Sequence, residues 1–144
     1  YVMDVNDDGL ADVVSSSAHR FGMWWHEQGR DAAGKTTWKL REIHSEYSQT
    51  HALSMVDFDG DGDMDLVSGM RYLAHQGLDP GEANPPTIFW LEFVPGERPT
   101  WVPHVIDSQS GVGLNNVVED VNGDGLLDIV IANKGGVFYF ERIP

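Results

Sequence analysis

The chain has 144 residues, no cysteine and a hydrophobic content of 41%, which is enough for the packed core of one domain. Its 23 acidic and 9 basic residues give a formal net charge of −14, which disfavours nucleic acid and anionic membrane surfaces as partners. No stretch reaches the roughly 18 consecutive apolar residues of a membrane span. The lack of cysteine excludes a disulfide framework and thiol chemistry.

The first feature along the chain is an acidic loop at residues 4–12, with sequence DVNDDGLAD. Asp or Asn occupies its positions 1, 3, 5 and 9, and these side-chain oxygens can converge on one hard cation together with the main-chain carbonyl of position 7. Glycine at position 6 permits the positive φ that turns the backbone around an ion. The same pattern recurs at residues 57–65 and 120–128, so the sequence predicts about three Ca²⁺ sites.

Fifteen residues occupy the ligand positions of the three loops. The predicted ligands are Asp4, Asn6, Asp8, Leu10 and Asp12 in the first loop, Asp57, Asp59, Asp61, Asp63 and Asp65 in the second, and Asp120, Asn122, Asp124, Leu126 and Asp128 in the third, with position 7 contributing its carbonyl oxygen.

Two other interpretations of the loops explain less. An EF-hand needs a Glu at position 12 and helices on both sides, but position 12 is Ser15, Ser68 or Ile131, and the β-branched residues after each loop favour strands. Metal-free Asp-Gly hairpin turns would explain the glycines but not the acids at positions 1 and 9. Each loop is therefore predicted to join two antiparallel strands that a metal ion clips together.

The loop belongs to a larger repeat. The three loops begin 53 and 63 residues apart, and Trp38 and Trp101 each stand 19 residues before the next loop. Within one unit we expect a strand before the loop, a strand after it, an aromatic strand (residues 21–25, 88–91 and 137–140) and a fourth strand that begins at the Trp. Four short antiparallel strands in about 50 residues are typical of a β-propeller blade.

The predicted fold is therefore all-β. We expect a β-propeller segment of about three four-stranded antiparallel blades in a single domain, with repeats near residues 1–50, 51–112 and 113–144. The last blade ends before a fourth strand, so it is predicted to be incomplete and the ring only partial. We expect the chain to be a piece of a longer polypeptide, with the ring completed by the remaining blades or by another copy of the chain.

These loop, aromatic and Trp motifs resemble the FG-GAP/VCBS repeat family, which includes the integrin α-chain propeller and many secreted bacterial proteins. The resemblance extends over nearly the whole chain. It implies a calcium-stabilised propeller, usually of six to eight blades. It implies no single activity, because the family contains adhesion modules, lectins and enzymes that act on polysaccharides.

A ligand is expected on the side of the blades opposite the acidic loops, where the connections between second and third strands lie. Arg71 and Lys134 are each six residues past the last Asp of their loop, and in so acidic a chain a basic cluster could bind a carboxylate or a sulfate. The second blade carries a long insert at residues 72–86, and long loops on rigid scaffolds often carry recognition. The residues assigned to this ligand face are His19, Arg20, Arg71, Tyr72, His75 and Lys134. Local pairing with acids, or a subunit contact, is the alternative role for them.

The six histidines show no His-x-x-x-His spacing, so the sequence alone supports no transition-metal site. The serine-rich runs lack a nucleophile-elbow context, and too few carboxylates lie outside the loops for a glycosidase pair, so no catalytic residue is assigned.

The predicted function is a calcium-binding repeat module of a secreted or surface protein, with a structural, adhesion or ligand-binding role toward a protein or a glycan. The alternative is a fragment of a propeller enzyme, a lyase or hydrolase that acts on polysaccharide. Since loops of this kind fill best at millimolar calcium, we expect an extracellular, periplasmic or cell-surface location.

Overall fold

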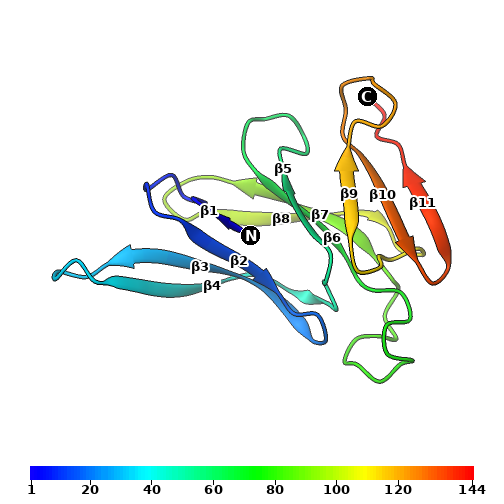
Figure 1. Ribbon diagram of the computed structural model, residues 1–144, viewed down its shortest axis with the longest axis horizontal. Coiled ribbons are helices and arrows are strands. Elements are labelled where there is room, and N and C mark those ends of the chain that lie inside the picture. Colours follow the sequence, from blue (N-terminus) through cyan, green and yellow to red (C-terminus); the bar gives the residue numbers. More distant parts are fainter.

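The computed structural model describes residues 1–144 and contains strands but no helix. The strands form three separate antiparallel sheets, in each of which the strands lie side by side in chain order (Figure 1). The first sheet contains β1 (Val2–Met3), β2 (Asp12–Ser16), β3 (Phe21–Arg30) and β4 (Thr36–Ser48). The second contains β5 (Leu53–Val56), β6 (Asp65–Gly69), β7 (Ile88–Val94) and β8 (Thr100–Asp107). The third contains β9 (Asn116–Glu119), β10 (Asp128–Asn133) and β11 (Gly136–Phe140).

The predicted all-β architecture is confirmed, including a last blade that has three strands rather than four. None of the sheets closes on itself, and the three stand next to one another as blades (Figure 1). The fourth strands start slightly before the predicted Trp residues. β4 begins at Thr36 and β8 at Thr100, because these β-branched residues already pair with Arg30 and Val94.

The register is the same in all three blades. In each blade a valine lies two residues after the last Asp of the loop. This valine pairs with Trp25 in the first blade, Trp90 in the second and Tyr139 in the third. These three aromatic residues are therefore structurally equivalent. Trp25 packs against residues of the second blade and Trp90 against residues of the third. Because the register is the same, Tyr139 lies on the corresponding face of the third blade.

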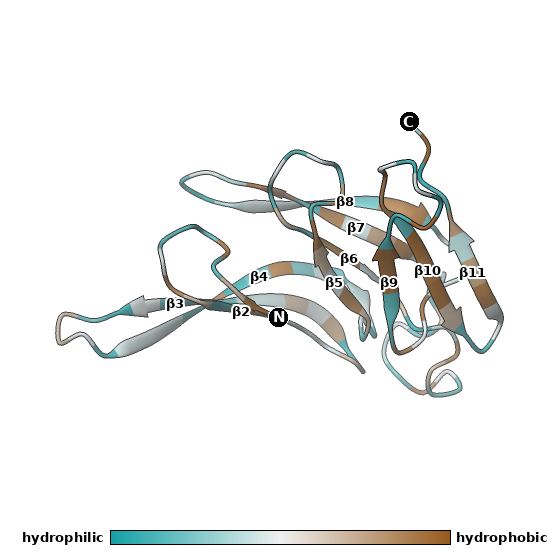
Figure 2. Ribbon diagram, turned by 45° about the horizontal axis from the view of Figure 1, so that its top comes forward, coloured by the Kyte–Doolittle hydropathy of each residue, from teal (hydrophilic) through white to brown (hydrophobic).

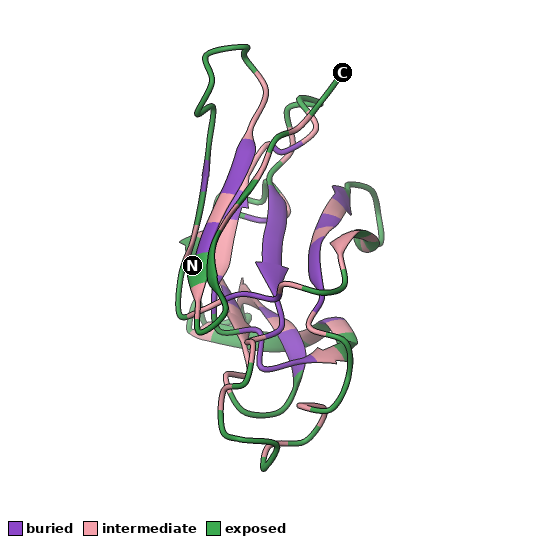
Figure 3. Cartoon of the chain, turned by 90° about the vertical axis from the view of Figure 1, so that its right-hand side faces the viewer, coloured by how far each residue is buried: buried purple, intermediate pink, exposed green.

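The middle blade is buried on both faces. Leu66 belongs to a hydrophobic cluster shared with the first blade, and its neighbour Val67 belongs to a second cluster shared with the third blade. All five residues of β6 are buried. Figure 2 shows the hydrophobic residues gathered in the sheets, and Figure 3 shows the exposed residues gathered in the loops at their ends. The core therefore consists of two layers between three sheets rather than one centre.

The outer faces of the first and third blades carry exposed apolar side chains. On the first blade Trp38 is 53% exposed and Leu40 62%; on the third, Val137 is 76% exposed and Tyr139 45%. Trp25, which is equivalent to Tyr139, is only 2% exposed because the second blade covers it. The structure contains no helix of a length and hydrophobicity suited to spanning a membrane.

Candidate metal centres and the opposite face

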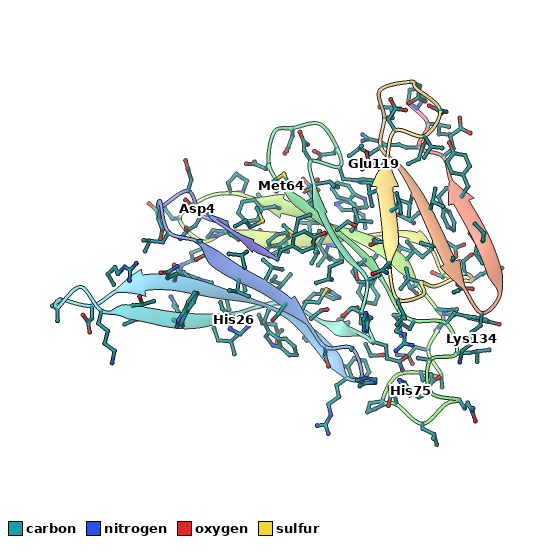
Figure 4. All side chains as sticks on the ribbon, viewed as in Figure 1. Asp4, His26, Met64, His75, Glu119 and Lys134 are labelled. Carbon is teal, nitrogen blue, oxygen red and sulfur yellow. The ribbon has the colours of Figure 1, made fainter.

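The three acidic loops connect the first two strands of each blade and lie at one end of the sheets (Figure 1). Figure 4 shows Met64 in the second loop and Glu119 before the third loop toward the top of the view, whereas His75 and Lys134 lie toward the bottom. The acidic loops and the predicted ligand face are therefore at opposite ends of the blades.

The first Asp of each loop folds the backbone around its own carboxylate. In all three loops this carboxylate accepts a hydrogen bond from the N–H of the glycine at position 6, with distances of 2.7 Å in the first loop, 3.1 Å in the second and 2.9 Å in the third. Those glycines have φ of 83°, 101° and 88°, which is the left-handed region that favours glycine. Each loop thus has the tight turn that the sequence predicts.

The second loop brings the carboxylates of Asp57, Asp59 and Asp61 together. One oxygen from each lies within 4.8 Å of the others. Carboxylates so close to one another repel, and the repulsion is relieved by a hard cation that accepts several oxygen ligands. In the first loop the buried side-chain oxygen of Asn6, at ligand position 3, has no hydrogen-bond partner. These residues fit Ca²⁺, which prefers carboxylate and carbonyl oxygens.

The acid at position 9 has a structural role that sequence reasoning missed. Asp12, Asp65 and Asp128 are 0%, 1% and 0% exposed, and each accepts a backbone N–H from the second residue of its own loop. Each also binds the main chain near the end of the third strand or just beyond it: Asp12 accepts from the N–H of Gln28, Asp65 from that of Phe93 and Asp128 from that of Arg142. The position-9 carboxylate therefore ties the loop to the far strand, through donors that are distant in sequence.

Two of these equivalent acids have opposite pKa shifts, because burial desolvates Asp65 in the middle blade more strongly than Asp128 in the third blade. Burial raises the pKa of Asp65 above its usual value, and the hydrogen bonds from Phe93 and Phe58 only partly oppose it. Burial also acts to raise the pKa of Asp128, but the donors on Arg142, Tyr139 and Val121 together outweigh it and lower that pKa. Tyr139 is the added side-chain donor, with its hydroxyl 2.8 Å from the carboxylate.

The predicted ligand-face residues fall into two groups in the structure. Arg71, Tyr72 and Lys134 line one cavity of about 370 Å³ between the second and third blades. The ammonium group of Lys134 donates to the carbonyl oxygens of Leu73 and, at 3.4 Å, of Ala74. Lys134 therefore fastens the long insert of the second blade as well as lining the cavity.

The second group consists of His19 and His75, which meet Asp79 at the contact between the first blade and the insert. Asp79 was not among the predicted site residues, because nothing in its local sequence marks it. Arg20, next to His19, is exposed, and its backbone N–H donates to the Ser17 hydroxyl at 3.0 Å.

The fold and its repeated loops define a β-propeller-type repeat module. Residues 4–68 match the sequence model of the FG-GAP-like repeat, from the first acidic loop to the strand after the second. These residues are thus an FG-GAP-like repeat, and the predicted family resemblance is confirmed over this part of the chain. No curated protein matches the chain.

Proposed function

We propose that this module binds Ca²⁺ in its three acidic loops and uses the ions to hold its blades in shape. The convergence of Asp57, Asp59 and Asp61 carries this proposal. The hydrogen bond from the position-6 glycine to the first Asp already closes the turn. The three carboxylates therefore form a preorganised set of hard oxygen ligands. When bound, the ion would supply charge neutralisation and a cross-link between neighbouring strands, and it has no redox role.

The proposed setting is a secreted, periplasmic or cell-surface protein, where calcium is abundant enough to fill such loops. In that setting the module would have a structural, adhesion or ligand-binding role. The cavity lined by Arg71, Tyr72 and Lys134 supports a ligand on the end away from the calcium loops, with an anionic group of a glycan or a protein as the chemistry it would accept.

Further propeller blades are the proposed structural partners, either from the same polypeptide or from another copy of this chain. Trp25 and Tyr139 are equivalent, but the first is covered by a following blade and the second is exposed. The exposed Trp38 and Leu40 on the first blade support a partner at the other end as well. Sedimentation analysis tests this proposal: a stable, soluble, calcium-loaded monomer of the chain alone would count against it.

The test of calcium binding compares thermal unfolding in calcium and in EDTA. We expect calcium to raise the Tm of the wild-type chain, because a ligand at 100 times its Kd stabilises the folded state by about 2.7 kcal/mol. Asp61→Ala should reduce this gain and change little in EDTA. Asp7→Asn is the matched control, since Asp7 is an acid of the first loop at position 4, outside the ligand set, and asparagine tolerates its φ of 58°.

Two results would contradict the proposal. One is a wild-type chain whose Tm is the same in calcium and in EDTA. The other is an equal loss of stability for Asp61→Ala in both conditions, which would mean that the residue acts without a metal ion.

A further inference from the structure

The meeting point of His19, His75 and Asp79 joins two blades through side chains far apart in sequence. His19 lies in the turn between β2 and β3, and the other two lie in the long insert between β6 and β7. Nδ1 of His19 is 3.0 Å from Oδ2 of Asp79, and Nε2 of His75 is 3.7 Å from the same oxygen. The two imidazole rings are 4.6 Å apart between centroids and meet edge to face.

These distances match the spacing of ligands around a small divalent ion. Nitrogen and oxygen donors bind tetrahedral zinc at about 2.0–2.2 Å, which places neighbouring donors roughly 3.4 Å apart. The two measured separations lie on either side of that value, and one donor atom from each residue lies within 4.8 Å of the others. Only small side-chain adjustments would bring the three donors to one ion.

The insert is held in the conformation that presents these side chains. The carboxylate of Glu82 accepts the backbone N–H of His75 at 2.8 Å and that of Asp79 at 3.2 Å. Glu82 therefore clamps the segment that carries two of the three donors.

Two further contacts hold the insert against the first and third blades. Gly81 lies so close to Ser48 and Phe21 of the first blade that a Cβ there would stand 2.5 Å from the Ser48 hydroxyl oxygen. On the other side, Lys134 of the third blade donates to the carbonyls of Leu73 and Ala74. Since the insert is held by both neighbouring blades, little conformational entropy is lost when His75 and Asp79 bind an ion together with His19.

We propose that His19, His75 and Asp79 form a site for a divalent transition-metal ion, with Zn²⁺ as the favoured occupant. Two imidazoles and one carboxylate are the borderline donors that zinc binds, and they differ in kind from the all-oxygen sets of the acidic loops. The ion ties the insert of the second blade to the first blade. Because the His19 side chain is 56% exposed and that of His75 41%, the fourth position is open to water or to an anionic ligand.

The experiment measures zinc binding to the full chain by equilibrium dialysis in saturating calcium, which keeps the acidic loops from taking up zinc. We expect about one Zn²⁺ per chain. His19→Ala, His75→Ala and Asp79→Ala should each weaken the affinity by more than about 100-fold, since loss of even an outer-shell partner costs about 10–100-fold. His51→Ala is the matched control, because the His51 ring hydrogen-bonds to the Leu114 carbonyl and is not part of the cluster, so the affinity should be unchanged.

A second measurement guards against variants that fail to fold. X-ray absorption of zinc bound to the wild-type chain should show imidazole ligands, and Co²⁺ in its place should give the intense visible spectrum of a tetrahedral site. The proposal is overturned if zinc has an all-oxygen environment, if calcium displaces it, or if the folded His19 and His75 variants bind it as tightly as the wild type does. Those results would leave the cluster as a hydrogen-bonded His–Asp pair. The imidazole signature and the effects of the His19 and His75 variants distinguish this site from the acidic loops whether or not those loops bind calcium.

Discussion

The indole Nε1 of Trp25 donates a hydrogen bond of 2.8 Å to the carboxylate of Asp12, the last acid of the first loop. The third blade repeats the arrangement with a different donor, the hydroxyl of Tyr139 on Asp128. The equivalent residue of the second blade, Trp90, instead stacks on His104 with ring centroids 4.4 Å apart. An aromatic side chain thus donates to the last acid of the loop in two of the three blades.

Trp25→Phe should destabilise the chain more than Trp90→Phe. Both changes remove the same atoms from equivalent positions, but only the first leaves Asp12 without its side-chain donor. A hydrogen bond to a charged group contributes about 1.5–3 kcal/mol, so we expect the two variants to differ by about 2 kcal/mol in their free energies of unfolding. Urea denaturation measures this difference. Equal losses would mean that the indole N–H contributes nothing beyond packing.

Asp12→Ala should destabilise the chain both with and without calcium. The carboxylate of Asp12 accepts three donors, from Val5, Gln28 and Trp25, all of which lose their partner in the variant. We expect a loss of roughly 3 kcal/mol in EDTA, where Asp61→Ala should cost little. Chemical denaturation of both variants in EDTA tests the contrast. An Asp12 variant as stable as the wild type there would rule out the structural role of the position-9 acid.

Gly113→Ala should be strongly destabilising, because an added Cβ would stand 2.0 Å from the backbone carbonyl oxygen of Ala132 in the third blade. Backbone cannot move away as a side chain can, so we expect a loss of about 1–3 kcal/mol and a looser attachment of β10. Gly29→Ala is the control, since the nearest atom there is the Thr37 hydroxyl at 3.1 Å and its effect should stay within about 1 kcal/mol. Hydrogen exchange of β9–β11 amides would report the loosening, and unchanged protection in Gly113→Ala would contradict the prediction.

Stability should fall on acidification because of His44. Burial lowers the pKa of His44 below its ordinary value of 6.5, although the charges of Glu46 and Glu42 partly oppose this. Its ring stands 4.7 Å from that of Tyr47 and 6.5 Å from that of Phe89, at the contact between the first two blades. The unfolded chain therefore binds a proton at a higher pH than the folded chain does. The stabilisation is complete above pH 6.5 and is lost as pH falls through the lowered pKa.

His44→Phe should flatten this pH dependence below 6.5 while keeping the aromatic contact. Denaturation midpoints across this range, measured in saturating calcium, make the comparison. His51→Phe should keep the slope of the wild-type chain. A His44→Phe variant that keeps the full slope would assign the pH dependence to other groups.

The parts of this protein that the sequence predicts are those in which the determining residues are close together in the chain. An Asp at position 1 and a glycine at position 6 of the same loop are enough to specify the turn, because the hydrogen bond that closes it spans five residues. Strand type follows from β-branched and aromatic runs, and the blade follows from the repetition of these signals. The division into four, four and three strands could be predicted for the same reason.

Only the tertiary structure decides which residues meet between blades. His19 and Asp79 are 60 residues apart, and no spacing rule relates a turn of one blade to an insert of the next. Within the first blade, the contact of Asp12 with Trp25 likewise depends on the register of β2 and β3. Local turn and strand preferences act over a few residues, whereas contacts between packed sheets depend on how the whole chain is arranged. For that reason the acidic loops are visible in the sequence and the histidine cluster is not.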